Sequence, residues 1–98
     1  MLGFIQKIRK GTKYEKVERY RVIYNLSNCC YDNALKNPTV GNVSLYDALS
    51  HLVQVPELNI NMVIYDHLQF NTKAELDDKA AAYVKSQLDY LKCIIDNM

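Results

Sequence analysis

One helix-starting pattern occurs three times in this 98-residue chain and constrains its fold more than any other feature. Each copy places a Ser or Thr three residues before an acid, at Thr12–Glu15, Ser44–Asp47 and Thr72–Glu75. The hydroxyl caps a free backbone N–H of the first helical turn, while the acid reaches back to the N–H of the capping residue and meets the positive end of the helix dipole. Three such starts predict a mainly helical chain.

The spacing of apolar residues extends this expectation to an all-α fold, a small bundle of four to five helices forming a single domain over residues 1–98. The expected helices cover residues 2–10, 13–36, 44–54, 57–70 and 72–97. Gly11, Pro38 and Pro56 separate the first four, because glycine favours helix ends and proline cannot continue a helix. The long helices over 13–36 and 72–97 carry broad apolar arcs, which favours self-association through them.

Residues 57–70 fit two kinds of secondary structure. Leu58, Ile60 and Met62 alternate with polar neighbours as in a strand, whereas other apolar residues of the same stretch recur at helical spacing. Pro56 near the start favours a helix, and a lone strand would find no partner for its backbone hydrogen bonds elsewhere in the chain. We therefore expect a helix over 57–70, with a strand paired to the same strand of a second chain as the alternative.

Charge is distributed unevenly, although the net charge is only +1. Residues 1–21 hold seven Lys and Arg against two Glu, a balance of +5, and residues 22–98 hold five basic against nine acidic residues, a balance of −4. A basic helix face is ordinarily just solvated, but such asymmetry also indicates an anionic partner. The basic N-terminus is therefore the first candidate binding segment.

Tyrosines lie among these cations. Tyrosine rings between Lys and Arg are typical of proteins that stack single-stranded nucleic acid, and they equally fill gaps between packed helices. Both interpretations stay open from the sequence. The candidate binding residues are Lys7, Arg9, Lys10, Lys13, Lys16, Arg19, Tyr20, Arg21 and Tyr24.

The sequence contains no recognisable catalytic, metal-binding or nucleotide-binding motif. Neither His51 nor His67 stands at a metal-ligand spacing from a cysteine, and no glycine-rich phosphate loop is present. Cys29 and Cys30 are adjacent, which disfavours a bond between them and fits reduced thiols. We therefore predict no metal, no cofactor and no enzymatic activity.

The sequence contains no run of the roughly 20 apolar residues that a transmembrane helix needs. In residues 1–10 the charges follow the apolar stretch, the reverse of a secretory signal. We therefore expect a cytoplasmic protein without a membrane span.

Two functional hypotheses follow. The first is a small non-enzymatic interaction protein that binds a protein partner as an inhibitor, adaptor or immunity-type factor, and that forms a homodimer or a larger homo-oligomer. The alternative is a nucleic-acid-binding regulator that contacts phosphates through the basic N-terminal segment, residues 7–21. A phosphate binder would lose affinity steeply with salt, and this separates the two hypotheses.

Overall fold

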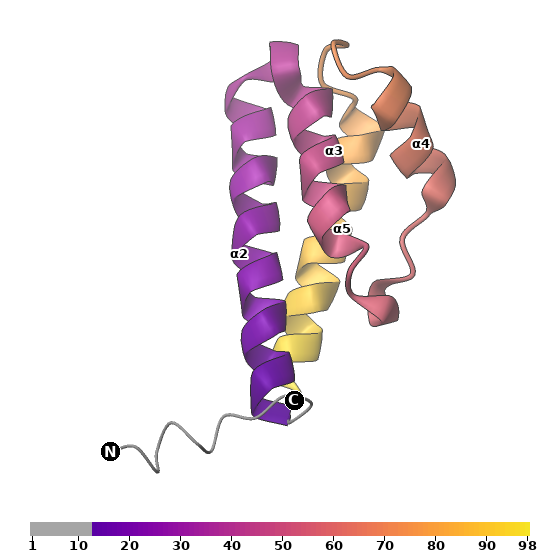
Figure 1. Cartoon of the computed structure of the whole chain (residues 1–98). Coiled ribbons are helices and arrows are strands. Elements are labelled where there is room, and N and C mark those ends of the chain that lie inside the picture. Colours follow the sequence, from indigo (N-terminus) through magenta and orange to yellow (C-terminus); the bar gives the residue numbers. More distant parts are fainter. Residues whose placement is uncertain (1–12) are drawn as a thin grey trace.

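The computed structural model describes residues 13–98 and confirms an all-α bundle (Figure 1). Its α-helices are α2 (Lys13–Lys36), α3 (Gly41–Leu52), α4 (Met62–Phe70) and α5 (Asp78–Asp96). Two short 3-10 turns, η1 (Pro38–Val40) and η2 (Pro56–Leu58), lie before and after α3. The expected helix over residues 2–10 and the cap at Thr12 lie outside the described residues.

Helices α2, α3 and α5 run side by side along the length of the molecule, and α4 flanks α3 on its outer side (Figure 1). α2 packs against both α3 and α5. α5 runs back along α2, so the end of the described chain lies beside the start of α2 (Figure 1). α2 therefore forms the spine of the bundle, as expected of the longest helix.

The core lies where these helices face one another. Leu45, Leu49 and Leu52 of α3 are fully buried, because their spacing places them on one helix face. Leu88 and Leu91 of α5 extend the same cluster. Amphipathic spacing in the sequence thus becomes one continuous apolar core, the main source of helix stability in a protein.

The predicted cap at Ser44 is wrong, because α3 begins three residues earlier, at Gly41. η1 continues directly into α3, and Ser44 is buried, its Oγ accepting a hydrogen bond from Asn33 Nδ2 at 2.7 Å. A Cβ atom at Gly41 would lie 2.8 Å from Leu76 Cδ1 and 3.1 Å from Leu76 Cα. Glycine therefore lets the start of α3 approach the segment that precedes α5.

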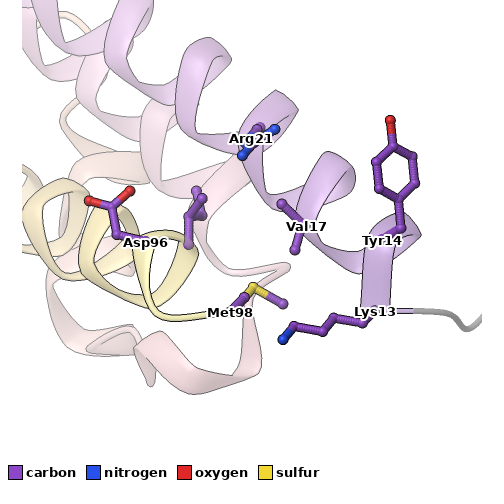
Figure 2. Close-up of a pocket in the computed structure, with 7 residues that line it drawn as sticks. Lys13, Tyr14, Val17, Arg21, Asp96 and Met98 are labelled. Atoms are coloured by element: carbon purple, nitrogen blue, oxygen red, sulfur yellow. The ribbon is translucent and has the colours of Figure 1, made fainter.

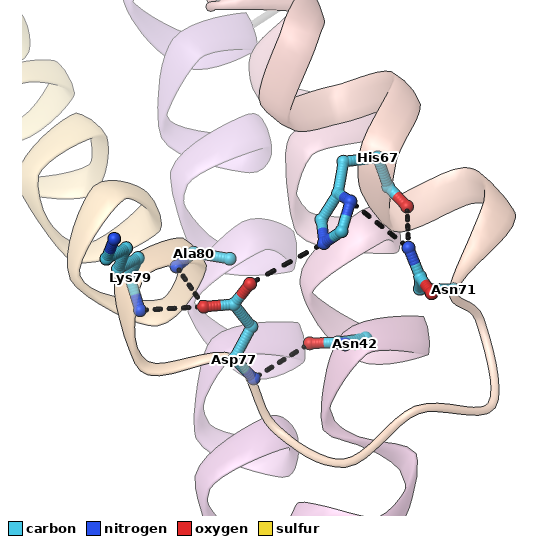
Figure 3. Close-up of polar contacts among 6 residues, drawn as sticks. All are labelled: Asn42, His67, Asn71, Asp77, Lys79 and Ala80. Atoms are coloured by element: carbon cyan, nitrogen blue, oxygen red, sulfur yellow. Dashed lines mark hydrogen bonds and ion pairs between the residues drawn. The ribbon is translucent and has the colours of Figure 1, made fainter.

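The predicted cap at Thr72 is also wrong, because α5 begins at Asp78 behind the cap residue Asp77. The Asp77 carboxylate accepts from the backbone N–H groups of Lys79 and Ala80 at 2.9 and 3.4 Å (Figure 3). The backbone N–H of Asp77 itself donates to Asn42 Oδ1 at 3.0 Å. This tertiary contact with α3 favours the later helix start over the local pattern at Thr72.

Residues 57–70 are helical only in part. η2 ends at Leu58. The next residue, Asn59, has a left-handed φ of 49°, which breaks the helix and which asparagine tolerates. α4 then starts at Met62, capped by Asn61 Oδ1, which accepts from Val63 N at 3.0 Å. The structure forms no strand anywhere in residues 13–98, so the alternative strand is wrong.

Candidate functional site

The residues of the predicted basic segment do not all lie together in the structure. Three of its residues lie outside the described part of the chain: Lys7, Arg9 and Lys10. Lys13 and Arg21 line a cavity between the start of α2 and the end of α5, whereas Lys16 and Arg19 lie around another side of α2. A helix turns by 100° per residue, which is why cations close in sequence are separated in space.

The cavity beside Lys13 has a volume of about 650 Å³ (Figure 2). Val17, Ile95 and Met98 supply apolar lining, and the charged rim carries both signs. Arg21 Nη1 lies 2.9 Å from Glu18 Oε1, and Asp96 Oδ2 lies 3.6 Å from Lys92 Nζ. Among residues 13–98, the cavity thus carries mixed charge, in contrast to the several converging cations that bind a phosphate group.

Tyr20 belongs to the core, because its side chain is only 1% exposed. Its hydroxyl donates to Glu57 Oε1 at 2.7 Å, and Lys16 Nζ lies 3.2 Å from Glu57 Oε2. The cationic groups of Lys16 and Arg19 lie 5.5 and 5.6 Å from the centroid of the Tyr20 ring. Tyr20 is therefore not placed to stack on a base, and it packs between helices, the other of the two interpretations that the sequence left open. Instead, this cluster attaches η2 to α2.

The same contacts change two pKa values. Burial, followed by the hydrogen bond to Glu57, raises the pKa of Tyr20 to about 12. The hydrogen bond from Tyr20 lowers the pKa of Glu57, and the ammonium group of Lys16 lowers it further. Each group holds the other in the protonation state that the contact needs at neutral pH.

Tyr24, the other predicted stacking residue, is half-buried and packs against the core. Tyr20 and Tyr24 therefore do not form the surface of interleaved tyrosines and cations that the sequence suggested, whereas Tyr14, which is 51% exposed, lines the cavity with Lys13 and Arg21. Lys13 and Arg21 are exposed beside the cavity, and Arg19 is exposed on another side of α2.

α4 exposes a different kind of surface. Phe70 is 85% exposed, Val63 is 77% exposed and Met62 is 53% exposed. Helical geometry places all three on one side, with the exposed acid Asp66 between them. We call these four residues the α4 outer face.

Sequence periodicity missed the α4 outer face because apolar residues occupy most sides of this helix. A helix with apolar residues on all sides is normally buried on all sides. This pattern could have indicated that α4 needs a second contact surface. Within the described chain, Leu68 is the one buried residue of α4. The bundle covers the inner side of α4, and its outer side remains exposed.

Several contacts hold α4 in place from its inner side. The Tyr65 ring stacks on Tyr46 of α3 with centroids 4.7 Å apart and planes 4° from parallel. The Tyr83 hydroxyl of α5 accepts from the backbone N–H of Asn61 at 2.6 Å. Near the other end, His67 Nε2 lies 3.6 Å from Asp77 Oδ2 (Figure 3). α4 is therefore fixed to the bundle at both ends while its outer face stays open.

The three cysteines are free: Cys29 and Cys93 are exposed, and Cys30 is half-buried. Burial raises the pKa of the Cys30 thiol, which favours an unreactive, protonated side chain. Among residues 13–98, no three His, Cys, Asp or Glu side chains gather as a metal site would require.

In this part of the chain, no helix has both the length and the apolar character needed to cross a bilayer. Comparisons with protein-family models, with curated proteins and with solved structures found no match.

Proposed function

We propose that this chain is a small non-enzymatic interaction protein that binds a protein partner through the α4 outer face. The observation that carries the proposal is the exposure of Val63 and Phe70, at 77% and 85%. Burying one such side chain is worth about 1.5–3 kcal/mol, and a partner that covers both recovers that free energy. An inhibitor, adaptor or immunity-type factor acts by such binding.

Isolated apolar residues on a surface are common and mean little. Three on one side of a nine-residue helix form a cluster, and α4 is already positioned by Tyr65 and His67. A preformed surface loses little conformational entropy on binding. The α4 outer face therefore has the apolar character and the fixed geometry that suit a docking site.

Affinity capture from the native cell with the tagged full chain tests this function. We expect V63E/F70E to lose the protein that the wild-type chain recovers, because two carboxylates cannot be buried in an apolar contact. V22E/L26E is the matched control, since it changes two exposed apolar residues of α2 in the same way. Circular dichroism verifies that each variant stays folded. Equal recovery by all three chains would contradict the proposal.

The nucleic-acid alternative uses the basic segment 7–21. It is supported by the exposure of Lys13, Arg19 and Arg21, but the ion pair of Arg21 and the burial of Tyr20 count against it. A gel-shift assay at 50 and 200 mM salt separates the two functions. A phosphate binder with about six contacts loses roughly 10³ in affinity over that range, whereas we expect no shift at either salt concentration.

A further inference from the structure

We propose that the α4 outer face binds residues 2–10 of a second copy of this chain. This inference rests on the proposed function, because it names the partner of the same surface. It accounts for the exposed side of α4 and for the basic N-terminal sequence with a single contact.

The apolar residues of the two surfaces are matched. Leu2, Ile5 and Ile8 recur at the spacing that gathers them on one side of a helix. An amphipathic helix of this kind binds by laying its apolar side on an exposed apolar surface. Val63 and Phe70 supply such a surface.

Charge complementarity selects α4 over the cavity at the start of α2. Residues 1–12 contain three cations and no acid, a balance of +3: Lys7, Arg9 and Lys10. Residues 62–78 have a balance of −3, from Asp66, Glu75, Asp77 and Asp78 against Lys73. The cavity beside Lys13 and Arg21 would instead place the segment against two cations and one acid, Asp96. Opposite charge steers association and fixes the register of the contact.

In the helical form that its apolar spacing predicts, the segment is too short for its own chain and requires a second copy. α2 begins at Lys13, and its 24 residues extend for about 36 Å. α4 lies toward the opposite end of α2, where His67 and Asp77 meet beside the start of α3 (Figures 1 and 3). As a helix, residues 2–10 span about 14 Å, and residues 11–12 add about 7 Å. The segment therefore falls short of α4 in its own chain.

Reciprocal docking of two copies gives a closed dimer. Each copy gives one N-terminal segment and receives one on its α4 outer face, so a twofold dimer satisfies both surfaces without open ends. The +3 balance of residues 1–12 then lies against the acidic residues 62–78 of the partner subunit. The charge asymmetry of the sequence is thus compensated between chains.

Charge exchange tests the contact in the full chain. One variant reverses the segment, K7E/R9E/K10E. Another, D66K/E75K, reverses Asp66 of the α4 outer face and the exposed Glu75 of the acidic stretch that precedes α5. Light scattering should give about twice the 11.4 kDa chain mass for the wild type and the single-chain mass for each variant alone, because like charges then meet. An equimolar mixture of the two variants should regain the dimer mass, since both contacts become complementary again.

D32K/D47K is the matched control, because it makes two acid-to-lysine changes at exposed positions of α2 and α3. It should remain a dimer. A monomeric wild type, variants that stay dimeric alone, or a mixture that stays monomeric would each overturn the inference. If the mixture fails while V63E/F70E still loses a different captured protein, the proposed function stands and only the identity of the occupant is wrong.

Discussion

α3 and α4 are neighbouring helices of similar apolar character, yet they differ in how many of their residues are buried. α3 buries seven of its twelve residues, among them Leu45 and Leu49, whereas Leu68 is the buried residue of α4. α3 lies among α2, α4 and α5, but α4 packs mainly against α3 alone. Apolar content therefore does not decide burial in this chain. The number of neighbours around each helix does.

The difference separates two uses of an apolar side chain. In α3 it stabilises the fold, because the neighbours that cover it belong to the same chain. On the outer side of α4 it leaves surface that another molecule can cover.

Leu49→Ala should lower the free energy of unfolding by about 2–5 kcal/mol, because it leaves a cavity surrounded by helices that cannot all move inward. Leu68→Ala should cost less, since α4 is covered on one side and can shift into the space. Urea unfolding followed by circular dichroism measures both. An equal loss in the two variants would show that α4 is as tightly integrated as α3.

Asp77→Ala should cost about 0.5–2 kcal/mol, because Asp77 caps α5 and also contacts His67 of α4. Thr72→Ala should change stability by less than about 0.5 kcal/mol, since Thr72 is not a helix cap in this fold. Thermal melting of the two variants compares them directly. A larger loss at Thr72 than at Asp77 would restore the helix start that the sequence pattern predicted.

The connection between α3 and α4 should be sensitive to alkaline pH. The pKa of Tyr20 is raised from 10.0 to about 12, so the folded chain keeps this proton while the unfolded chain releases it. The resulting stabilisation is complete below pH 10 and is lost as the pH rises through about 12. We expect the unfolding free energy of the wild type to fall more between these pH values than that of Tyr20→Phe. Parallel pH profiles would contradict the contact with Glu57.

V63S/F70S should change stability by less than about 0.5 kcal/mol per residue, because both side chains are mostly exposed in the single chain. The same variant should lose self-association. Melting at a concentration low enough to dissociate the dimer isolates the first effect, and light scattering at micromolar concentration measures the second. A large loss of stability in the monomer would mean that Val63 and Phe70 belong to the core.

Part of the fold could be predicted from local sequence. The end of α2 at Lys36 was predicted correctly because Pro38 prevents the helix from continuing, a purely local effect. The caps at Ser44 and Thr72 were wrong because tertiary contacts decided otherwise: Asn33 bonds Ser44, and Asn42 holds the segment before α5. Polar residues that cap helices also bond elsewhere, and sequence does not show which use applies.

The candidate surface was harder to predict than the fold. The sequence presents Tyr20 among cations, but Tyr20 is buried in the core and its hydroxyl bonds Glu57, 37 residues away. The outer side of α4 carries no periodic signal because apolar residues lie on its inner side as well. Both failures have one cause: exposure is set by which helices become neighbours, and local spacing does not contain that information.

Cross-linking between chains tests most directly whether the α4 outer face binds the N-terminal segment of a second copy. In a chain carrying C29S, C30A and C93S, one variant adds V63C and another adds I5C. On mixing and mild oxidation, we expect mass spectrometry to identify a disulfide between positions 63 and 5 as the main product. A control mixture of V22C with I5C should give little. Absence of the 63–5 bond, or equal yields in the two mixtures, would contradict the account.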